Sequence, residues 1–175
     1  MTTPTLETER LILRPLNTSD AAEVLDCWES DPDVAKYMFW SSHNDINKTK
    51  EWISFETGKI DSDDWYRWVF VSKESGKLLG TGLIYFEEEY NKYEIGYNLG
   101  KTAWGYGYTT EAMSRVIRFA KDQLGINQIV GRHAKENPAS ENVMKKLGFK
   151  YIKDIPYECN DGKNTYEGKE YILEL

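Results

Sequence analysis

Two glycines separated by one residue lie between an apolar stretch and a stretch with helical spacing. Gly105 and Gly107 are followed by Tyr108, Thr109 and Thr110, and then by a regular apolar repeat. Glycine permits a close backbone approach or a positive φ angle, and the free N–H groups at a helix start attract anions. The spacing therefore predicts a loop that holds an anionic diphosphate. The alternative is a plain glycine-rich turn in which Thr109 or Thr110 caps the next helix.

The same segment differs from three other nucleotide-binding patterns. The Gly-Lys-Ser/Thr of a P-loop is absent, and a dinucleotide-binding fingerprint needs a third glycine and an early βαβ position. Residues 105–108 are similar to the aromatic core of an RNA-recognition-motif strand. Trp104 replaces the basic residue expected there, however, and the residues after Tyr108 are typical of a helix start. We therefore do not expect nucleic acid as a partner.

Three polar residues elsewhere have types and positions suited to proton transfer or ligand binding. Glu94 lies in the otherwise apolar stretch 93–99, where a carboxylate can take a proton directly or through water. Alternation with its apolar neighbours also allows Glu94 to be an outward-facing strand residue. Asn137 and Ser140 flank Pro138 at a predicted helix start. Each of these two can also be a plain cap or first-turn residue.

Length, composition and charge favour one globular domain over residues 1–175. The chain is 40% hydrophobic and has a net charge of −7, from 22 Lys+Arg and 29 Asp+Glu. An acidic balance argues against nucleic acid and favours a cationic or amine partner. We expect a cytoplasmic protein without membrane contact, since no apolar run has the length of a signal peptide or a membrane span. The spacing of the Cys and His residues indicates neither a disulfide nor a metal site.

Hydrophobic periodicity predicts the elements that must position these residues. Strands are expected at 6–16, 65–71, 78–87, 93–99 and 128–134, with further strands from 149 and after a turn at 161–162. Helices are expected after 18 and 32, near 47–55, from about 110 to Gly125, and from Pro138 to Gly148. The pattern therefore predicts an α/β fold with a mixed, mostly antiparallel sheet and helices on its faces.

Several segments resemble the GNAT superfamily of N-acetyltransferases, in the right order along nearly the whole chain. They are Trp104-Gly-Tyr-Gly-Tyr-Thr-Thr-Glu-Ala112, Asn137-Pro-Ala-Ser140 and Lys145-Lys-Leu-Gly-Phe149. Residues 6–16 and 93–97 are similar to the branch that contains the ribosomal-protein N-terminal alanine acetyltransferases, the RimJ/RimL type. The resemblance implies a GNAT fold of six to seven strands, splayed between strands 4 and 5, and acetyl-CoA as cofactor.

The resemblance also implies roles for individual residues. Ser140 is expected near the thioester sulfur as partner of the thiolate, and Glu94, in an apolar strand beside the groove where the cofactor is expected, is the expected base. The expected cofactor-binding residues are Tyr97, Asn98, Leu99, Trp104, Gly105, Tyr106, Gly107, Tyr108, Thr109, Asn137 and Ser140. The expected amine-side residues are Trp28, Tyr37, Phe39, Trp40 and Tyr157, all of which can equally belong to the core.

Two positions depart from the pattern of the superfamily. Thr102 stands where Gln or Arg often supports the phosphates, and Met144 stands where many members have a tyrosine as general acid. The general acid is therefore unassigned. Met144 also fits a plain core position.

The implied reaction is direct attack of a primary amine on acetyl-CoA in a ternary complex. An α-amine with a pKa near 7.8 needs less help to lose its proton than a lysine near 10.4. The resemblance to the ribosomal-protein branch implies the same acceptor, a protein N-terminal α-amine. Two alternatives remain: a small-molecule amine such as a polyamine, an aminoglycoside or an amino-acid-like compound, or a non-catalytic acyl-CoA-binding module. A monomer and a homodimer are both compatible with the sequence.

Overall fold

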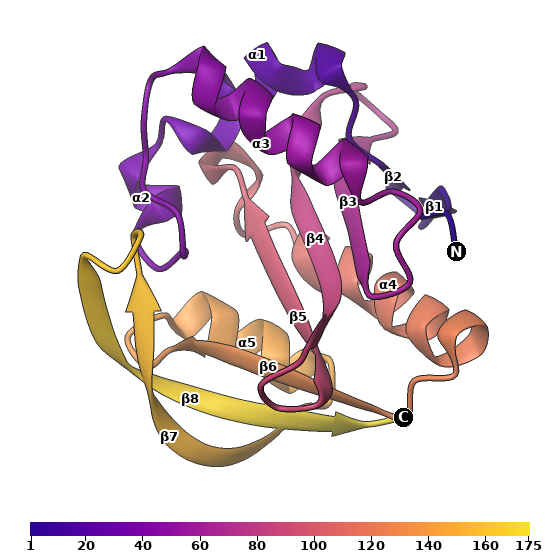
Figure 1. Ribbon diagram of the computed structural model, residues 1–175, viewed down its shortest axis with the longest axis vertical. Helices are drawn as coiled ribbons and strands as arrows, with labels where there is room; N and C mark the ends of the chain where they lie inside the picture. Colours follow the sequence, from indigo (N-terminus) through magenta and orange to yellow (C-terminus); the bar gives the residue numbers. More distant parts are fainter.

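The computed structural model describes residues 1–175 and has one eight-stranded sheet between helices (Figure 1). The strand order is β1-β2-β3-β4-β5-β6-β8-β7. The strands are β1 (Leu6–Glu7), β2 (Leu11–Arg14), β3 (Trp65–Ser72), β4 (Leu78–Glu87), β5 (Lys92–Leu99), β6 (Gln128–Ala134), β7 (Lys150–Cys159) and β8 (Asn164–Glu174). Only β5 and β6 are parallel neighbours; the other pairs are antiparallel. The mixed, mostly antiparallel α/β fold predicted from the sequence is confirmed.

The segment 6–16 forms two strands, so the prediction of a single strand there, and of six to seven in all, was wrong. β1 and β2 pair as a hairpin around Thr8–Arg10. Glu111, far along the chain, holds this turn by accepting hydrogen bonds from the Thr8 hydroxyl at 2.7 Å and the Arg10 backbone N–H at 2.8 Å. The Arg10 Nε donates to the same carboxylate at 2.7 Å. The reversal therefore depends on a distant residue that local periodicity does not reveal.

Helices on the two faces of the sheet pack against different apolar clusters. On one face lie α1 (Ala21–Val24), the π-helical η2 (Leu25–Glu29), α2 (Pro32–Ala35) and α3 (Ile46–Gly58), which follow the short η1 (Thr18–Asp20). Their cluster includes Val24, Trp28, Ile53 and Val69. On the other face, α4 (Tyr108–Leu124) and α5 (Pro138–Lys146) pack in the larger core through residues such as Val116 and Met144. None of these helices is long and apolar enough to cross a membrane.

β5 and β6 separate along their length, as the resemblance predicted for the fourth and fifth strands. Their pairing covers only Tyr93–Ile95 against Ile129–Gly131. Beyond this point, 96–99 of β5 pair with β4 alone, while 132–134 of β6 pair with β8. The end of β5 therefore has an inner edge whose backbone groups lack a neighbouring strand. The short η3 (Lys101–Ala103) follows and leads to the glycine pair.

Candidate active site

A cavity of about 560 Å³ is lined by residues from the end of β5, the glycine loop, α2 and α5. This volume falls in the range of small-molecule and cofactor sites. β5 contributes Tyr97, Asn98 and Leu99; the loop and the start of α4 contribute Trp104, Gly105, Gly107, Tyr108, Thr109 and Thr110. α5 and its cap contribute Asn137, Ala139, Ser140, Asn142, Val143 and Lys146, and the α2 segment contributes Asp33, Val34, Lys36, Tyr37 and Met38. Of the expected cofactor-binding residues, Tyr106 alone is outside this lining.

The glycine loop has the backbone geometry that an anion site requires. Gly105 and Gly107 have φ angles of +84° and +79°, which strongly favour glycine. Gly107 is the N-cap of α4, and no side chain caps the helix. The alternative of a cap by Thr109 or Thr110 was therefore wrong. The N–H groups of the first turn of this 17-residue helix are available to phosphate oxygens.

Tyr97 and Ser140 meet across the cavity through their hydroxyl groups. The Tyr97 Oη lies 2.8 Å from the Ser140 Oγ and 3.3 Å from the Ser140 carbonyl oxygen. Burial raises the pKa of Tyr97, so the phenol keeps its proton across the physiological range. The Asn137 Oδ1 accepts a hydrogen bond from the Ser140 backbone N–H at 3.3 Å, which caps α5. The Asn137 side chain therefore acts as a helix cap whatever else it binds.

Glu94 is a buried carboxyl on β5 rather than an outward-facing strand residue. It is 4% exposed, and its Oε2 has no hydrogen-bond partner. Burial raises the pKa of Glu94 to about 7, although the charge of Arg132 and a hydrogen bond with Tyr85 act in the opposite direction. The Arg132 Nη1 lies 3.5 Å from the Glu94 Oε2. Glu94 lies three residues before Tyr97 but does not itself line the cavity.

The five residues expected on the amine side have different environments. Tyr37 lines the cavity, and its hydroxyl donates to the Glu136 carbonyl oxygen at 3.3 Å. Phe39 is 56% exposed and packs against the buried Tyr157, with ring centroids 5.5 Å apart. Trp28 and Trp40 pack in or against the cluster under α1 and α3. Because Trp28 is only 1% exposed, it has no surface to offer an amine, so we assign it to the core.

The turn between β7 and β8 lies beside α2 and fixes this side of the cavity (Figure 1). The Asn160 backbone N–H donates to the Met38 carbonyl oxygen at 2.9 Å. Its side-chain amide donates to the carbonyl oxygens of Ala35 at 2.9 Å and Trp40 at 3.1 Å. Asn160 therefore joins the C-terminal hairpin to the α2 segment.

Sequence reasoning missed Arg132, Lys36 and Lys146. Arg132 reaches Glu94 from the neighbouring parallel strand, a pairing with no local signal. Lys36 and Lys146 line the cavity and have no ion pair among the salt bridges of the structure, although Lys36 contacts the Tyr37 ring. The one signal available was that Lys146 precedes the Leu-Gly-Phe sequence at the end of α5. Met144, at the position of the missing tyrosine, is 1% exposed and lies in the core.

Comparisons with known proteins agree with this geometry. The chain is 32% identical over 146 residues to p20 of Bacillus licheniformis, an uncharacterized N-acetyltransferase, and the match covers 83% of this chain and 82% of that protein. The solved structure of the microcin C7 self-immunity acetyltransferase MccE with acetyl-CoA and AMP has a TM-score of 0.84 at 19% identity, covering 95% and 93% of the two chains.

The solved structure of RimL, a ribosomal L7/L12 alpha-N-protein acetyltransferase in complex with coenzyme A, has a TM-score of 0.83 at 14% identity. The match covers 100% of this chain and 98% of RimL. The family model described as an acetyltransferase (GNAT) domain matches residues 10–150. The uncapped start of α4 lines the cavity, as a site for the phosphates of acetyl-CoA requires. The chain therefore belongs to the GNAT family and is an N-acetyltransferase that uses acetyl-CoA.

Proposed function

We propose that the protein acetylates the α-amine at the N-terminus of a protein or peptide. The observation that carries this proposal is the Glu94 carboxyl, whose pKa burial raises to about 7. A base with this pKa is well matched to an α-amine with a pKa near 7.8 and poorly matched to a lysine near 10.4. RimL, which shares the fold, is by name an alpha-N-protein acetyltransferase, in line with this acceptor.

The chain's own groups would bind the cofactor along one path. The loop around Gly105 and Gly107 and the first turn of α4 would hold the pyrophosphate through backbone N–H groups. The inner edge of β5 at 96–99, which pairs only with β4, would accept the amide groups of the pantetheine arm as a neighbouring strand would. Bound acetyl-CoA supplies an acetyl group activated as a thioester.

Proton transfers at the two ends of the reaction fall to two different sites. The ionised Glu94 would take the proton of the ammonium group, through water because the carboxyl lies outside the cavity lining. Ser140, held 2.8 Å from the Tyr97 hydroxyl, would donate to the leaving sulfur. This arrangement gives the thiolate a partner without the tyrosine that Met144 replaces.

The eight strands form one sheet from Leu6 to Glu174, which supports a single domain over 1–175.

The test is a comparison of acceptors with the purified enzyme. We expect turnover of a peptide with a free N-terminus and none of the same peptide when its N-terminus is blocked and an internal lysine is free. Glu94→Gln should lose turnover while keeping its affinity for acetyl-CoA. Turnover of spermidine or an aminoglycoside in place of the peptide would assign a small-molecule acceptor instead. Binding of acetyl-CoA without turnover of any amine would indicate a non-catalytic module.

A further inference from the structure

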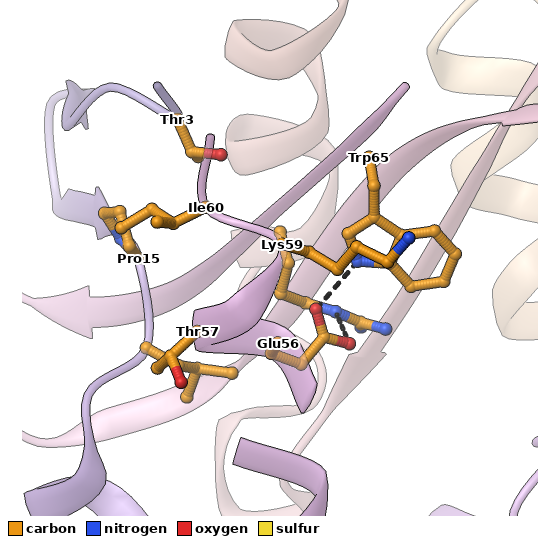
Figure 2. A pocket seen from close by; sticks show the side chains of 9 residues that line it. Thr3, Pro15, Glu56, Thr57, Lys59, Ile60 and Trp65 are labelled. Atoms are coloured by element: carbon orange, nitrogen blue, oxygen red, sulfur yellow. Dashed lines mark hydrogen bonds and ion pairs between the residues drawn. The ribbon is translucent and has the colours of Figure 1, made fainter. Parts of the chain in front are cut away.

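A chain of side-chain hydrogen bonds crosses the sheet from α3 to Asn98 at the cavity. Glu56, at the end of α3, accepts from the Trp65 Nε1 at 2.8 Å and from the Arg67 Nε at 3.0 Å. Figure 2 shows these two contacts converging on the Glu56 carboxylate. The Arg67 Nη1 then donates to the Thr81 Oγ1 at 3.1 Å, and the Thr81 Oγ1 lies 2.6 Å from the Asn98 Oδ1.

The donors and acceptors in this chain give it one direction. A guanidinium group has only donors, so the Thr81 oxygen must accept from Arg67. Thr81 is completely buried, and its single O–H can then be satisfied only by donating to Asn98. The Asn98 amide must therefore present its oxygen to Thr81, because the reverse orientation would leave a buried hydroxyl without an acceptor.

This orientation leaves the other end of the Asn98 amide without a protein partner. The Nδ2 group of Asn98 is buried and makes no hydrogen bond with any other group of the protein. An amide NH₂ group in such a position is costly unless a ligand supplies an acceptor. Asn98 lines the cavity, so a substrate bound there is close to this residue.

We propose that Glu56, Arg67 and Thr81 are positioning residues that hold the Asn98 amide so that its nitrogen donates to a carbonyl oxygen of a bound substrate. Two substrates carry such an oxygen. One is acetyl-CoA, with its thioester and pantetheine carbonyls; the other is a peptide acceptor, with the carbonyl of its first residue. The acceptor half of this proposal rests on the proposed function, whereas the acetyl-CoA half does not.

The experiment compares Thr81 variants that differ in the hydroxyl group. Thr81→Ser keeps the hydroxyl, and Thr81→Ala and Thr81→Val remove it. Thr49→Val is the matched control, since Thr49 is equally buried and its hydroxyl donates at 2.6 Å to Glu29, outside this chain of contacts. The dissociation constant of acetyl-CoA is measured by calorimetry, which needs no acceptor. The KM of the peptide acceptor and kcat are measured at saturating acetyl-CoA.

Loss of the Thr81 hydroxyl should weaken the binding of one of the two substrates by roughly 2- to 12-fold, which is the effect of one hydrogen bond. Thr81→Ser and Thr49→Val should match the wild type. If acetyl-CoA binds more weakly, the carbonyl that Asn98 contacts belongs to the cofactor. If the KM of the acceptor rises while the affinity for acetyl-CoA is unchanged, this carbonyl belongs to the acceptor. If no peptide is turned over, the proposed function fails, and calorimetry still tests the cofactor half.

A double-mutant cycle separates positioning from general destabilisation. If Thr81 acts only through Asn98, Thr81→Val should cause no further loss in an Asn98→Ala background. Additive losses in the double variant would overturn the proposal. So would a Thr81→Ala variant with the same acetyl-CoA affinity, acceptor KM and kcat as Thr81→Ser. The Ser and Ala pair keeps this test available should Thr81→Val fold poorly.

Discussion

At the scale of single residues, Glu94 is a buried carboxyl whose negative charge is only partly balanced by a neighbouring cation. Its nearest cation, Arg132, lies 3.5 Å away and is shared with Glu170, whose Oε1 is 3.0 Å from the Arg132 Nε. Arg132 also lies over the Tyr90 ring, 3.9 Å from its centroid. Burial therefore prevails, and the pKa of Glu94 rises to about 7 instead of falling. Carboxyl groups with such shifts are concentrated at functional sites.

The first prediction concerns the pH dependence of the reaction. Because Glu94 must be ionised to accept a proton, kcat/KM should fall with decreasing pH through a pKa of about 7. In the residual activity of Glu94→Gln, this fall should move to the pKa of the acceptor amine itself, near 7.8, whereas Glu29→Gln, at another buried carboxyl, should keep the wild-type profile. The measurement is kcat/KM of a peptide acceptor between pH 5.5 and about 9. A wild-type limb retained in Glu94→Gln would exclude Glu94 as the base.

The second prediction concerns stability at the same residue. The folded-state pKa of Glu94 is raised from 4.5 to about 7, so the native state holds a proton that the unfolded chain loses. This contribution to stability is present below about pH 4.5 and is lost as pH rises through about 7. Glu94→Gln should therefore raise the free energy of unfolding at pH 8 by up to about 3 kcal/mol, and by much less at pH 5.

Denaturant unfolding of both proteins at pH 5 and pH 8 checks this prediction. Glu29→Gln is again the control, because Glu29 accepts a hydrogen bond from Thr49 and pairs with His43. We expect that change to destabilise the protein rather than stabilise it. Equal destabilisation by both substitutions at pH 8 would contradict a raised pKa at Glu94.

At the scale of elements, α5 offers a test of whether Asn137 is a cap alone. Its side chain accepts a hydrogen bond from the Ser140 N–H, a role that aspartate performs equally well. Asn137→Ala should lower the free energy of unfolding by about 1 kcal/mol, and Asn137→Asp should not. If the amide NH₂ also binds the pantetheine arm, Asn137→Asp should keep its stability but bind acetyl-CoA more weakly. Unfolding and calorimetry together distinguish the two roles.

Elements defined by local patterns could be predicted from the sequence, and those defined by distant contacts could not. Gly125 ends α4 with a φ of +66°, as predicted from the end of the apolar repeat. The glycine loop also follows from residue types and spacing alone. The turn at Thr8–Arg10, in contrast, depends on Glu111, about a hundred positions away.

The same distinction applies to the candidate site. Tyr97, Asn137 and Ser140 lie in local segments that resemble the family, and the structure brings all three to the cavity. The Glu94–Arg132 contact needs β5 and β6 as parallel neighbours joined by a long crossover. The burial of Trp28 depends on how α3 and β3 pack around it. Side-chain surroundings of this kind are properties of the assembled sheet, which hydrophobic periodicity does not specify.

At the scale of the whole molecule, acetyl-CoA should stabilise the fold because its site joins separate elements. The cavity is lined by β5, α2, α4 and α5, so a bound ligand contacts elements that are far apart in the sequence. Ligand at about 100 times Kd adds roughly 2.7 kcal/mol. The thermal midpoint should therefore rise by about 5–11 °C for a domain of this size. ATP is the control nucleotide, and an equal shift with ATP would contradict a site specific for acetyl-CoA.

The separation of β5 from β6 also bears on how the protein avoids aggregation. A free strand edge can pair with another chain, but the inner edge of β5 faces a cavity bounded by α2 and α5. Of the outer edges, β1 has only two residues. β7 is longer, and it carries exposed Lys150, Lys153 and Pro156 together with a bulge near Tyr151. Charge, proline and a bulge all oppose edge-to-edge pairing at β7, so the edge left free for an extended ligand is the inner edge of β5, between two helices.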